Sequence, residues 1–148
     1  MRASDLVVPV PTVTTDDSVS KAVRLMAQEQ LPGLVVVDDA NRPRYVLPGT
    51  QVLRLTVLRP YQDDPALARA IDEAHADVFW RELGHRTVGD CISTPANKLV
   101  SVTEDATLLE VATVMGRMRS PLIAVTNASG ELVGAVTLTA LLSCLAMD

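Results

Sequence analysis

The feature that most constrains the fold of this chain is an internal repeat. When the sequence is shifted by 89 positions, residues 13–53 lie on residues 102–142 without a gap, and 8 of the 41 aligned pairs are identical. The apolar pattern repeats as well, because Val19, Ala22, Val23 and Met26 fall on Leu108, Val111, Ala112 and Met115. That spacing marks one face of a helix. We therefore expect two copies of one folding unit.

Each copy predicts the order strand, helix, strand, strand, helix. Short first strands are expected at 12–14 and 100–103. Ser18 and Thr107 are placed to cap the helices that follow, since a hydroxyl can accept a hydrogen bond from a free N–H of the first turn. Thr107 and Glu110 also have the spacing of a capping box.

A proline ends the first helix of each copy and forces the preceding residue toward extended geometry: Pro32 in one, Pro121 in the other. Four consecutive apolar residues follow, which suits a strand buried on both faces. The remaining elements are a polar turn, a third strand and a second helix. These segments are residues 34–37, 38–41 and 44–58 in the first copy, and 122–125, 127–130 and 131–146 in the second.

A separate helix is expected between the copies, over residues 63–83. Asp64 can cap it, Pro65 fits its first turn and Gly84 can end it. Its apolar stripe would consist of Leu67, Ile71, Ala74 and Val78. We accordingly divide the chain into repeat 1 (residues 1–58), an inserted helical linker (59–86) and repeat 2 (87–148).

The same inserted segment carries the only Phe and Trp of the chain, Phe79 and Trp80. Aromatic side chains there are expected to pack on the module or across a dimer. Asp72 and His75 have helical spacing, but no third residue is placed to complete a metal site. We interpret that pair as part of a solvated helix face.

Composition argues against several classes of protein. The net charge is −5, Lys and Arg are scattered, and aromatic residues make up 3% of the chain, so a nucleic-acid binder is not expected. The longest uncharged stretch, Leu132–Met147, has 16 residues, short of the roughly 20 needed to span a bilayer. No signal peptide is recognised, so a cytoplasmic location is expected. Cys91 and Cys144 are interpreted as buried thiols.

No catalytic motif is present, and the two histidines, His75 and His85, leave a general base scarce. Pairs of acidic residues occur, but each lies at a turn or helix start, where carboxylates serve as caps. We therefore expect no enzyme and no required cofactor.

The duplicated order and the string SPLIAVTNASGELVGAVT, residues 120–137, resemble the CBS domain, a module named after cystathionine beta-synthase. The resemblance implies an α/β (α+β) fold of two βαββα repeats packed about a pseudo-twofold axis, with the inserted helix between them. It also implies clefts between the repeats for adenosine-containing ligands such as AMP, ATP, NAD or S-adenosylmethionine, assembly into a homodimer, and signalling to a partner protein.

The motif of this family is Gly-apolar-apolar-Thr/Ser-x-x-Asp, in which the Asp accepts from ribose hydroxyls. In repeat 2, Gly134 and Thr137 match this motif, and Ala140 stands at the Asp position. In repeat 1, Pro48 replaces the Thr, and Gln51 replaces the Asp. Gln51 could still offer one acceptor and two donors to a ribose; alternatively it is a solvated residue of a first helical turn. Neither repeat keeps the carboxylate.

The resemblance further implies that backbone groups hold the base and that basic residues before the second strand meet phosphate. The candidate base contacts are Val13, Gly33, Leu34, Val102, Leu122 and Ile123. The candidate phosphate ligands are Arg117 and Arg119, which have Gln28 and Gln30 as counterparts in repeat 1. Arg suits phosphate because its planar fork forms two-point contacts. Alternatively, both arginines are solvated residues at the C-terminal end of a helix, where their positive charge interacts favourably with the helix dipole.

Two hypotheses follow from these residues. The first is a regulatory module that binds an adenosine-containing ligand near Arg119 and Thr137 and signals to a separate protein. The second is a degenerate pair without ligand, which acts only in dimerisation or protein interaction and uses the inserted helix as its contact surface. The missing carboxylates favour the second, while Thr137 and the two arginines favour the first.

Overall fold

The computed structural model describes residues 1–56, 83–92 and 99–147, together with the single positions 64, 66, 69, 77 and 81. Repeat 1 contains β1 (Thr12–Val13), α2 (Val19–Glu29), β2 (Gly33–Val37), β3 (Pro43–Pro48) and α3 (Gly49–Thr56). Repeat 2 contains β4 (Ser101–Thr103), α6 (Leu108–Met118), β5 (Leu122–Thr126), β6 (Leu132–Thr137) and α7 (Leu138–Ala146). The predicted order is confirmed. The expected helix at 63–83, with Asp72, His75, Phe79 and Trp80, falls outside the continuous described ranges.

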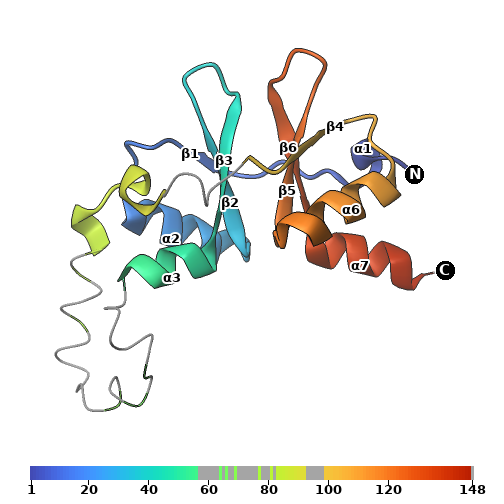
Figure 1. Cartoon of the computed structure of the whole chain (residues 1–148). Coiled ribbons are helices and arrows are strands. Elements are labelled where there is room, and N and C mark those ends of the chain that lie inside the picture. The colour runs from blue at the N-terminus through green and yellow to red at the C-terminus, as the bar shows by residue number, and fades with distance from the viewer. Residues whose placement is uncertain are drawn as a thin grey trace.

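Each repeat forms one three-stranded sheet of the same topology. The orders are β1-β2-β3 and β4-β5-β6, with the first pair parallel and the second antiparallel in both sheets. The two sheets meet at the centre of the molecule, with α2 and α3 beside the first sheet and α6 and α7 beside the second (Figure 1). The chain is therefore a mixed α/β pair of repeats about a pseudo-twofold axis.

Strand β2 is buried on both faces, as its run of apolar residues predicts. All five of its residues are buried. Leu34 and Val36 belong to the core of repeat 1, whereas Val35 and Val37 join the core of repeat 2. Because successive side chains of a strand point to opposite faces, one strand supplies both cores. Strand β2 therefore lies between the two apolar cores and contributes to each.

The predicted caps begin both first helices. Ser18 Oγ accepts from the Lys21 amide at 3.1 Å, and Thr107 Oγ1 accepts from the Glu110 amide at 3.2 Å. The carboxylate of Asp17 also accepts from the Thr14 amide at 2.8 Å, and this bond holds the pKa of Asp17 below its usual value. Asp17 thus organises the turn before α2, whereas the hydroxyl of Ser18 caps the helix itself.

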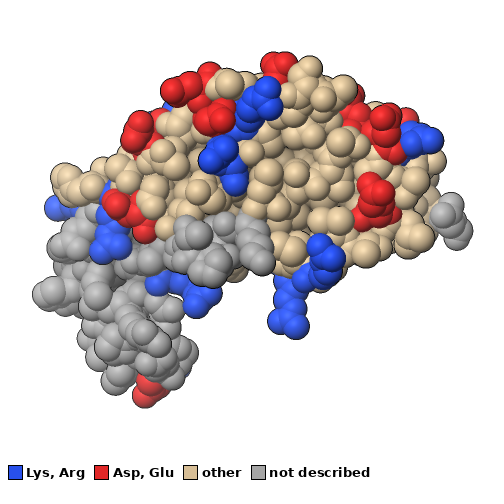
Figure 2. Space-filling view, turned by 45° about the horizontal axis from the view of Figure 1, so that its top comes forward, with Lys and Arg blue, Asp and Glu red and all other residues tan. Residues whose placement is uncertain are grey.

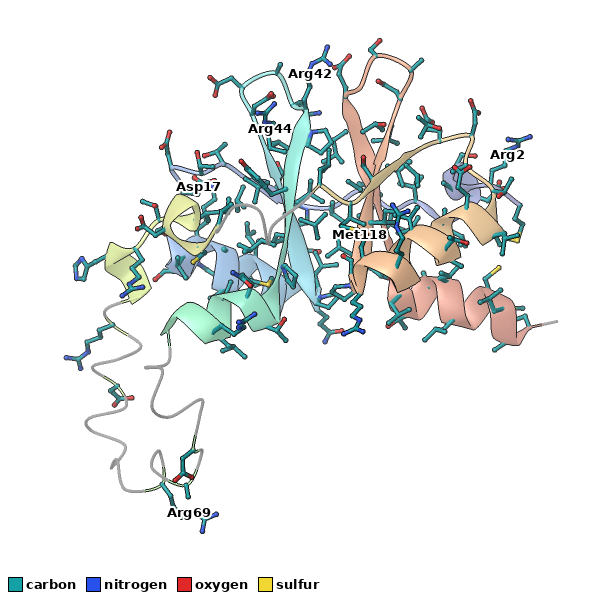
Figure 3. The ribbon with its side chains drawn as sticks, in the orientation of Figure 1. Arg2, Asp17, Arg42, Arg44, Arg69 and Met118 are labelled. Carbon is teal, nitrogen blue, oxygen red and sulfur yellow. The ribbon has the colours of Figure 1, made fainter. Side chains whose placement is uncertain are left out.

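The two hairpin turns touch each other. Asp38 Oδ1 accepts from the amides of Ala40 and Arg42 at 2.9 and 3.0 Å, and Asn127 organises the second turn in the same way. The Leu132 amide donates across to Asn41 O at 3.0 Å. The symmetry-related bond cannot form, because its donor would be Pro43, which has no N–H. Arg42 lies between the two turns (Figure 3).

Sequence reasoning did not find that the two repeats exchange the segments that lead into them. We call residues 1–8 and 86–92 the leading segments. The first includes the short helix α1 (Ala3–Leu6) and crosses to repeat 2, where α1 lies beside α6 (Figure 1). The Ala3 amide donates to Ala106 O at 2.8 Å, and the fully buried Ala3 belongs to the core of repeat 2.

The second leading segment contains the 3-10 helix η3 (Val88–Cys91) and packs on repeat 1. The Val88 amide donates to Asp17 O at 2.8 Å, and Val88 and Cys91 are buried in the core of repeat 1. Both segments share one hydrogen bond, since Asp5 accepts from the Arg2 amide and Asp90 accepts from the Thr87 amide. Only the second completes a capping box, because Thr87 Oγ1 also accepts from the Asp90 amide at 3.3 Å. The segments therefore repeat with a shift of 85 rather than 89.

Gly134 marks the place where the first leading segment docks. The amides and carbonyls of Val8 and Ala135 exchange two hydrogen bonds of 3.0 Å, so Val8 extends the edge of β6. A Cβ at Gly134 would overlap Val8 O and would lie 2.9 Å from Val7 Cγ2. A side chain cannot fit there, which gives this glycine a packing role.

We expect Gly134→Ala to lower the free energy of unfolding by about 3 kcal/mol, because overpacking forces the backbone apart. Gly116→Ala is the matched control: Gly116 is in a helix and a Cβ there meets nothing within 4 Å. That substitution should raise stability by up to about 1 kcal/mol. Urea unfolding of both variants measures the difference, and equal effects would contradict this role of Gly134.

Candidate functional site

The candidate base contacts lie in the strands and are buried. Val13 pairs with Val36, and Val102 pairs with Val125. The exposed fractions of the candidate apolar side chains are 1% for Val13, 1% for Leu34, 8% for Val102, and 0% for Leu122 and Ile123. Because these side chains are buried, contact between a ligand and the backbone of these residues stays a prediction.

Gly33 and Leu122 are equivalent positions of the two repeats, and they contact each other. A Cβ on Gly33 would lie 2.8 Å from Leu122 Cδ2 and 2.8 Å from Leu47 O. The side chain of Leu122 therefore fills the space that Gly33 leaves. The structure places both residues at the contact between the repeats.

Thr137 caps helix α7. Its Oγ1 accepts from the Ala140 amide at 3.1 Å, so Ala140 is the third residue of the helix. The Leu138 amide donates to Pro121 O at 2.9 Å, which ties the start of α7 to the start of β5. The hydroxyl hydrogen of Thr137 is left for another acceptor. Thr137 and Ala140 are both half-buried.

Helix α3 begins differently, because Pro48 stands where repeat 2 has its capping threonine. The Gly49 amide donates to Pro32 O at 2.9 Å, which matches the bond from Leu138 to Pro121. Gln51 is half-buried, and its Nε2 donates to Cys91 O at 3.3 Å. The amide that replaces the family carboxylate is thus engaged with the second leading segment. Burial raises the pKa of the Cys91 thiol.

The candidate phosphate ligands lie at the end of α6. Arg119 is the C-cap and has a left-handed backbone with φ 51°; its counterpart Gln30 has φ 53°. The side chains of Arg117 and Arg119 are exposed. The next residue, Ser120, is buried, and its Oγ donates to Leu122 O at 2.6 Å. Sequence reasoning missed Ser120, although a hydroxyl between a helix end and a buried strand is a recognisable signal.

A cavity of about 570 Å³ opens beside Arg119. It lies between α6 and α7 and also includes Thr50 from the first turn of α3, so both repeats contribute to it. Its lining is mostly apolar: Thr50, Ala112, Met115, Gly116, Arg119, Ser120, Pro121, Leu138, Leu141, Leu142 and Leu145. A volume of this size falls within the range of small-molecule sites.

Of the predicted site residues, the cavity includes only Arg119. Thr137 and Ala140 lie at the start of the adjacent helix α7, and their side chains are not part of the lining. Thr50, Met115 and the leucines of α7 were not predicted. The apolar spacing within residues 138–145 is the signal that could have found the leucines, whereas no local pattern points to Thr50.

Other kinds of site find little support in the described ranges. No group of three or more His, Cys, Asp and Glu residues there is placed to hold a metal ion. On the face shown in Figure 2, Lys and Arg lie in separate small groups interspersed with acidic residues. None of the helices in the described part of the chain has the length and apolar character to span a bilayer.

The comparisons with known proteins now give the family. The CBS domain model matches residues 3–56 and 88–147, so the chain belongs to the CBS domain family, as a tandem pair. A CBS domain-containing protein of unknown function from Kribbella flavida is 40% identical, with a TM-score of 0.80 and 99% of each chain covered.

Two solved structures of the CBS-pair protein CBSX2 share the fold. The one from Arabidopsis thaliana is 19% identical, with a TM-score of 0.75, and covers 99% of this chain and 94% of its own. The structure of CBSX2 in complex with AMP is 20% identical, with a TM-score of 0.69, and covers 99% and 96%. Among curated proteins, no relative matches this chain.

Arg119 has two features that can be tested separately: a left-handed backbone that ends α6, and a side chain that lines the cavity. We expect Arg119→Gly to keep or raise stability by up to about 1 kcal/mol, because glycine adopts positive φ without steric cost. Gln30→Gly, at the equivalent cap of α2, is the matched control and should behave alike. Thermal unfolding of both variants tests this; a clear loss in Arg119→Gly alone would mean that its side chain supports the fold.

Proposed function

We propose that this CBS pair is a non-enzymatic regulatory module that binds an adenosine-containing ligand of the AMP, ATP, NAD or S-adenosylmethionine class between its repeats. Binding would change the relative position of the two repeats and so signal to a separate partner protein. The observation that carries the proposal is the cavity at Arg119, to which both repeats contribute. No cofactor is required.

The chemistry of the cavity suits one end of such a ligand. The guanidinium of Arg119 can bind phosphate oxygens in two-point fashion. Met115 and Leu138 offer apolar surface to a flat base, and Thr50 adds a hydroxyl from the other repeat. The complex of CBSX2 with AMP supports an adenine nucleotide as the first ligand to test.

We expect the ligand to bind near the end of α6 in repeat 2 and not at the equivalent position in repeat 1. Repeat 1 has Gln30 in place of Arg119 and Pro48 in place of Thr137, so it lacks both the cation and the hydroxyl. Ala140 at the third position of α7 leaves the ribose without its usual carboxylate. A lost charge-assisted hydrogen bond weakens binding by roughly 10- to 100-fold without abolishing it. We therefore propose one weakly bound ligand per chain.

A thermal-shift screen tests the proposal with AMP, ADP, ATP, NAD, S-adenosylmethionine and cyclic dinucleotides. A ligand at 100 times its Kd should stabilise the fold by about 2.7 kcal/mol, which raises Tm by roughly 5–10 °C for a chain of this size. Arg119→Gly should lose about half of the shift or more at the same ligand concentration, and Gln30→Gly should keep it. The proposal fails if no ligand raises Tm and isothermal titration detects no binding.

Ala140→Asp adds a test of the ribose position. The new carboxylate should tighten binding by roughly 10-fold or more if the ribose lies at the start of α7. It also completes a capping box with Thr137, so its effect on stability must be measured without ligand. Unchanged affinity in a more stable protein would place the ribose elsewhere.

The second candidate function is a dimerisation module without ligand, and the surface of α7 favours it. Leu138, Leu142 and Leu145 are 41%, 54% and 51% exposed and follow one face of a helix that has no charged residue. Leu53, the counterpart of Leu142 on α3, is 52% exposed. We propose that a second copy covers this apolar surface, because two chains of charge −5 approach best through uncharged faces.

Size-exclusion chromatography with light scattering tests the dimer. We expect a mass of twice the 15.9 kDa of one chain, and Leu142→Asp should yield monomers because a buried unpaired charge is costly. Leu109→Asp adds a charge at a leucine outside the stripe and should remain dimeric. A dimer in both variants would exclude α7 as the contact, and a variant lacking residues 63–83 would then test the inserted segment.

A further inference from the structure

The second leading segment, residues 86–92, is fastened to repeat 1 by backbone hydrogen bonds. The Val88 amide donates to Asp17 O at 2.8 Å, and the Gly89 amide donates to Thr15 O at 2.9 Å. The Val19 amide donates back to Arg86 O at 2.9 Å. All of these bonds reach the loop and helix start between β1 and α2. They leave the end of the segment, around Cys91, to be held by other contacts.

Gln51 supplies such a contact at Cys91. Its Nε2 donates to the carbonyl of this residue at 3.3 Å, across 40 positions of the sequence. The Cys91 side chain is 1% exposed, so its carbonyl lies against the core of repeat 1. A neutral hydrogen bond of this kind contributes modestly to stability, but a buried carbonyl that loses its donor is costly.

Repeat 2 provides the comparison within the same chain. There the position of Gln51 is held by Ala140, whose methyl group can donate no hydrogen bond. Its leading segment is held at Ala3 and Ser4, whose amides donate to Ala106 O at 2.8 Å and Glu104 O at 3.1 Å. The side-chain bond to a leading segment from the third residue of the second helix is thus specific to repeat 1.

We infer that Gln51 is a positioning residue, which fastens the second leading segment to helix α3 and passes ligand occupancy beside α3 on to that segment. The second part rests on the proposed function, because it needs a ligand in the cleft. A shift of α3 that follows contact between the ligand and Thr50 removes the donor from Cys91 O. The segment that leads into repeat 2 then loosens on the core of repeat 1.

Amide hydrogen exchange followed by NMR tests the positioning role. In Gln51→Ala, the amides of Val88 and Gly89 should exchange roughly 2- to 10-fold faster, the change expected from one net hydrogen bond. The Ala3 amide in the other leading segment should not change. Gln28→Ala, at an exposed glutamine of α2, is the control variant. Equal acceleration at Ala3 would indicate a global effect, and either that result or no acceleration overturns the inference.

Gln51→Glu should make the protection of the segment depend on pH, which a simple loss of packing would not do. An ionised carboxylate cannot donate to Cys91 O, whereas a protonated carboxyl can. Protection of Val88 should therefore be low at pH 7 and recover below about pH 4, near the ordinary pKa of Glu. Gln51→Ala must be measured at each pH as a control. Asp17 and Asp90 hold the same segment and titrate in the acid range, and the charge of Arg86 lies near Asp90 and Cys91. No recovery relative to Gln51→Ala contradicts the bond.

The ligand arm uses AMP with the unchanged protein. If AMP raises Tm and also speeds exchange at Val88 and Gly89, with Ala3 unchanged, the coupling is supported. If AMP raises Tm without altering exchange at those amides, the coupling is wrong and the proposed function stands. If AMP and the other ligands do not bind, both the coupling and the proposed function fail, while the variants alone decide whether Gln51 positions the segment.

Discussion

The fold depends on a sheet in each repeat that has two apolar faces but only one layer of helices to cover them. In repeat 1, α2 and α3 cover the face that carries Leu34 and Val36. The face of Val35 and Val37 must be buried elsewhere, and the sheet of repeat 2 buries it. Since apolar area removed from water drives folding, neither repeat is a sufficient unit by itself. The cavity at Arg119 follows from this arrangement, because only paired repeats bring Thr50 beside α6 and α7.

The exchanged leading segments strengthen the dependence of each repeat on the other, because each segment is joined by the chain to one repeat and packs on the other. Ala3 completes the core of repeat 2 from the start of the chain, and Val88 completes the core of repeat 1 from the middle. A movement between the repeats therefore cannot occur without consequence for these segments. The hydrogen bonds that hold these segments include the one from Gln51 to Cys91 O.

Much of the fold could be predicted from the sequence, because its signals are local. Ser18 and Thr107 cap helices, and the apolar runs become doubly buried strands, as residue type and spacing predict. The helices do not end at Pro32 and Pro121, however, but two residues earlier, at the left-handed caps Gln30 and Arg119. The exchange of leading segments was missed, because Arg2–Asp5 and Thr87–Asp90 repeat with a different shift and their docking depends on tertiary contacts. The site was predictable only in part. Arg119 lines the cavity, but Gln51 bonds to a carbonyl 40 positions away, which no local pattern reveals.

The contacts of the family motif in repeat 2 show that its Gly and Thr have structural roles. Gly134 admits the first leading segment to the edge of β6, and Thr137 caps α7. Both residues would be retained for folding alone. Their presence in repeat 2 is thus weaker support for a ligand than the sequence suggests, and the support shifts to Arg119, whose backbone conformation would suit glycine better.

The contact between Gly33 and Leu122 bears on how such a pair could have arisen. These two positions are equivalent, and they meet at the pseudo-twofold axis. A symmetric dimer of single repeats would place the same residue there twice, so two leucines would collide and two glycines would leave a void. Joining the repeats in one chain removes that restriction, since each half can then evolve its own residue at the axis. The knob of one half and the hole of the other record this loss of symmetry, and they commit the halves to each other rather than to copies of themselves.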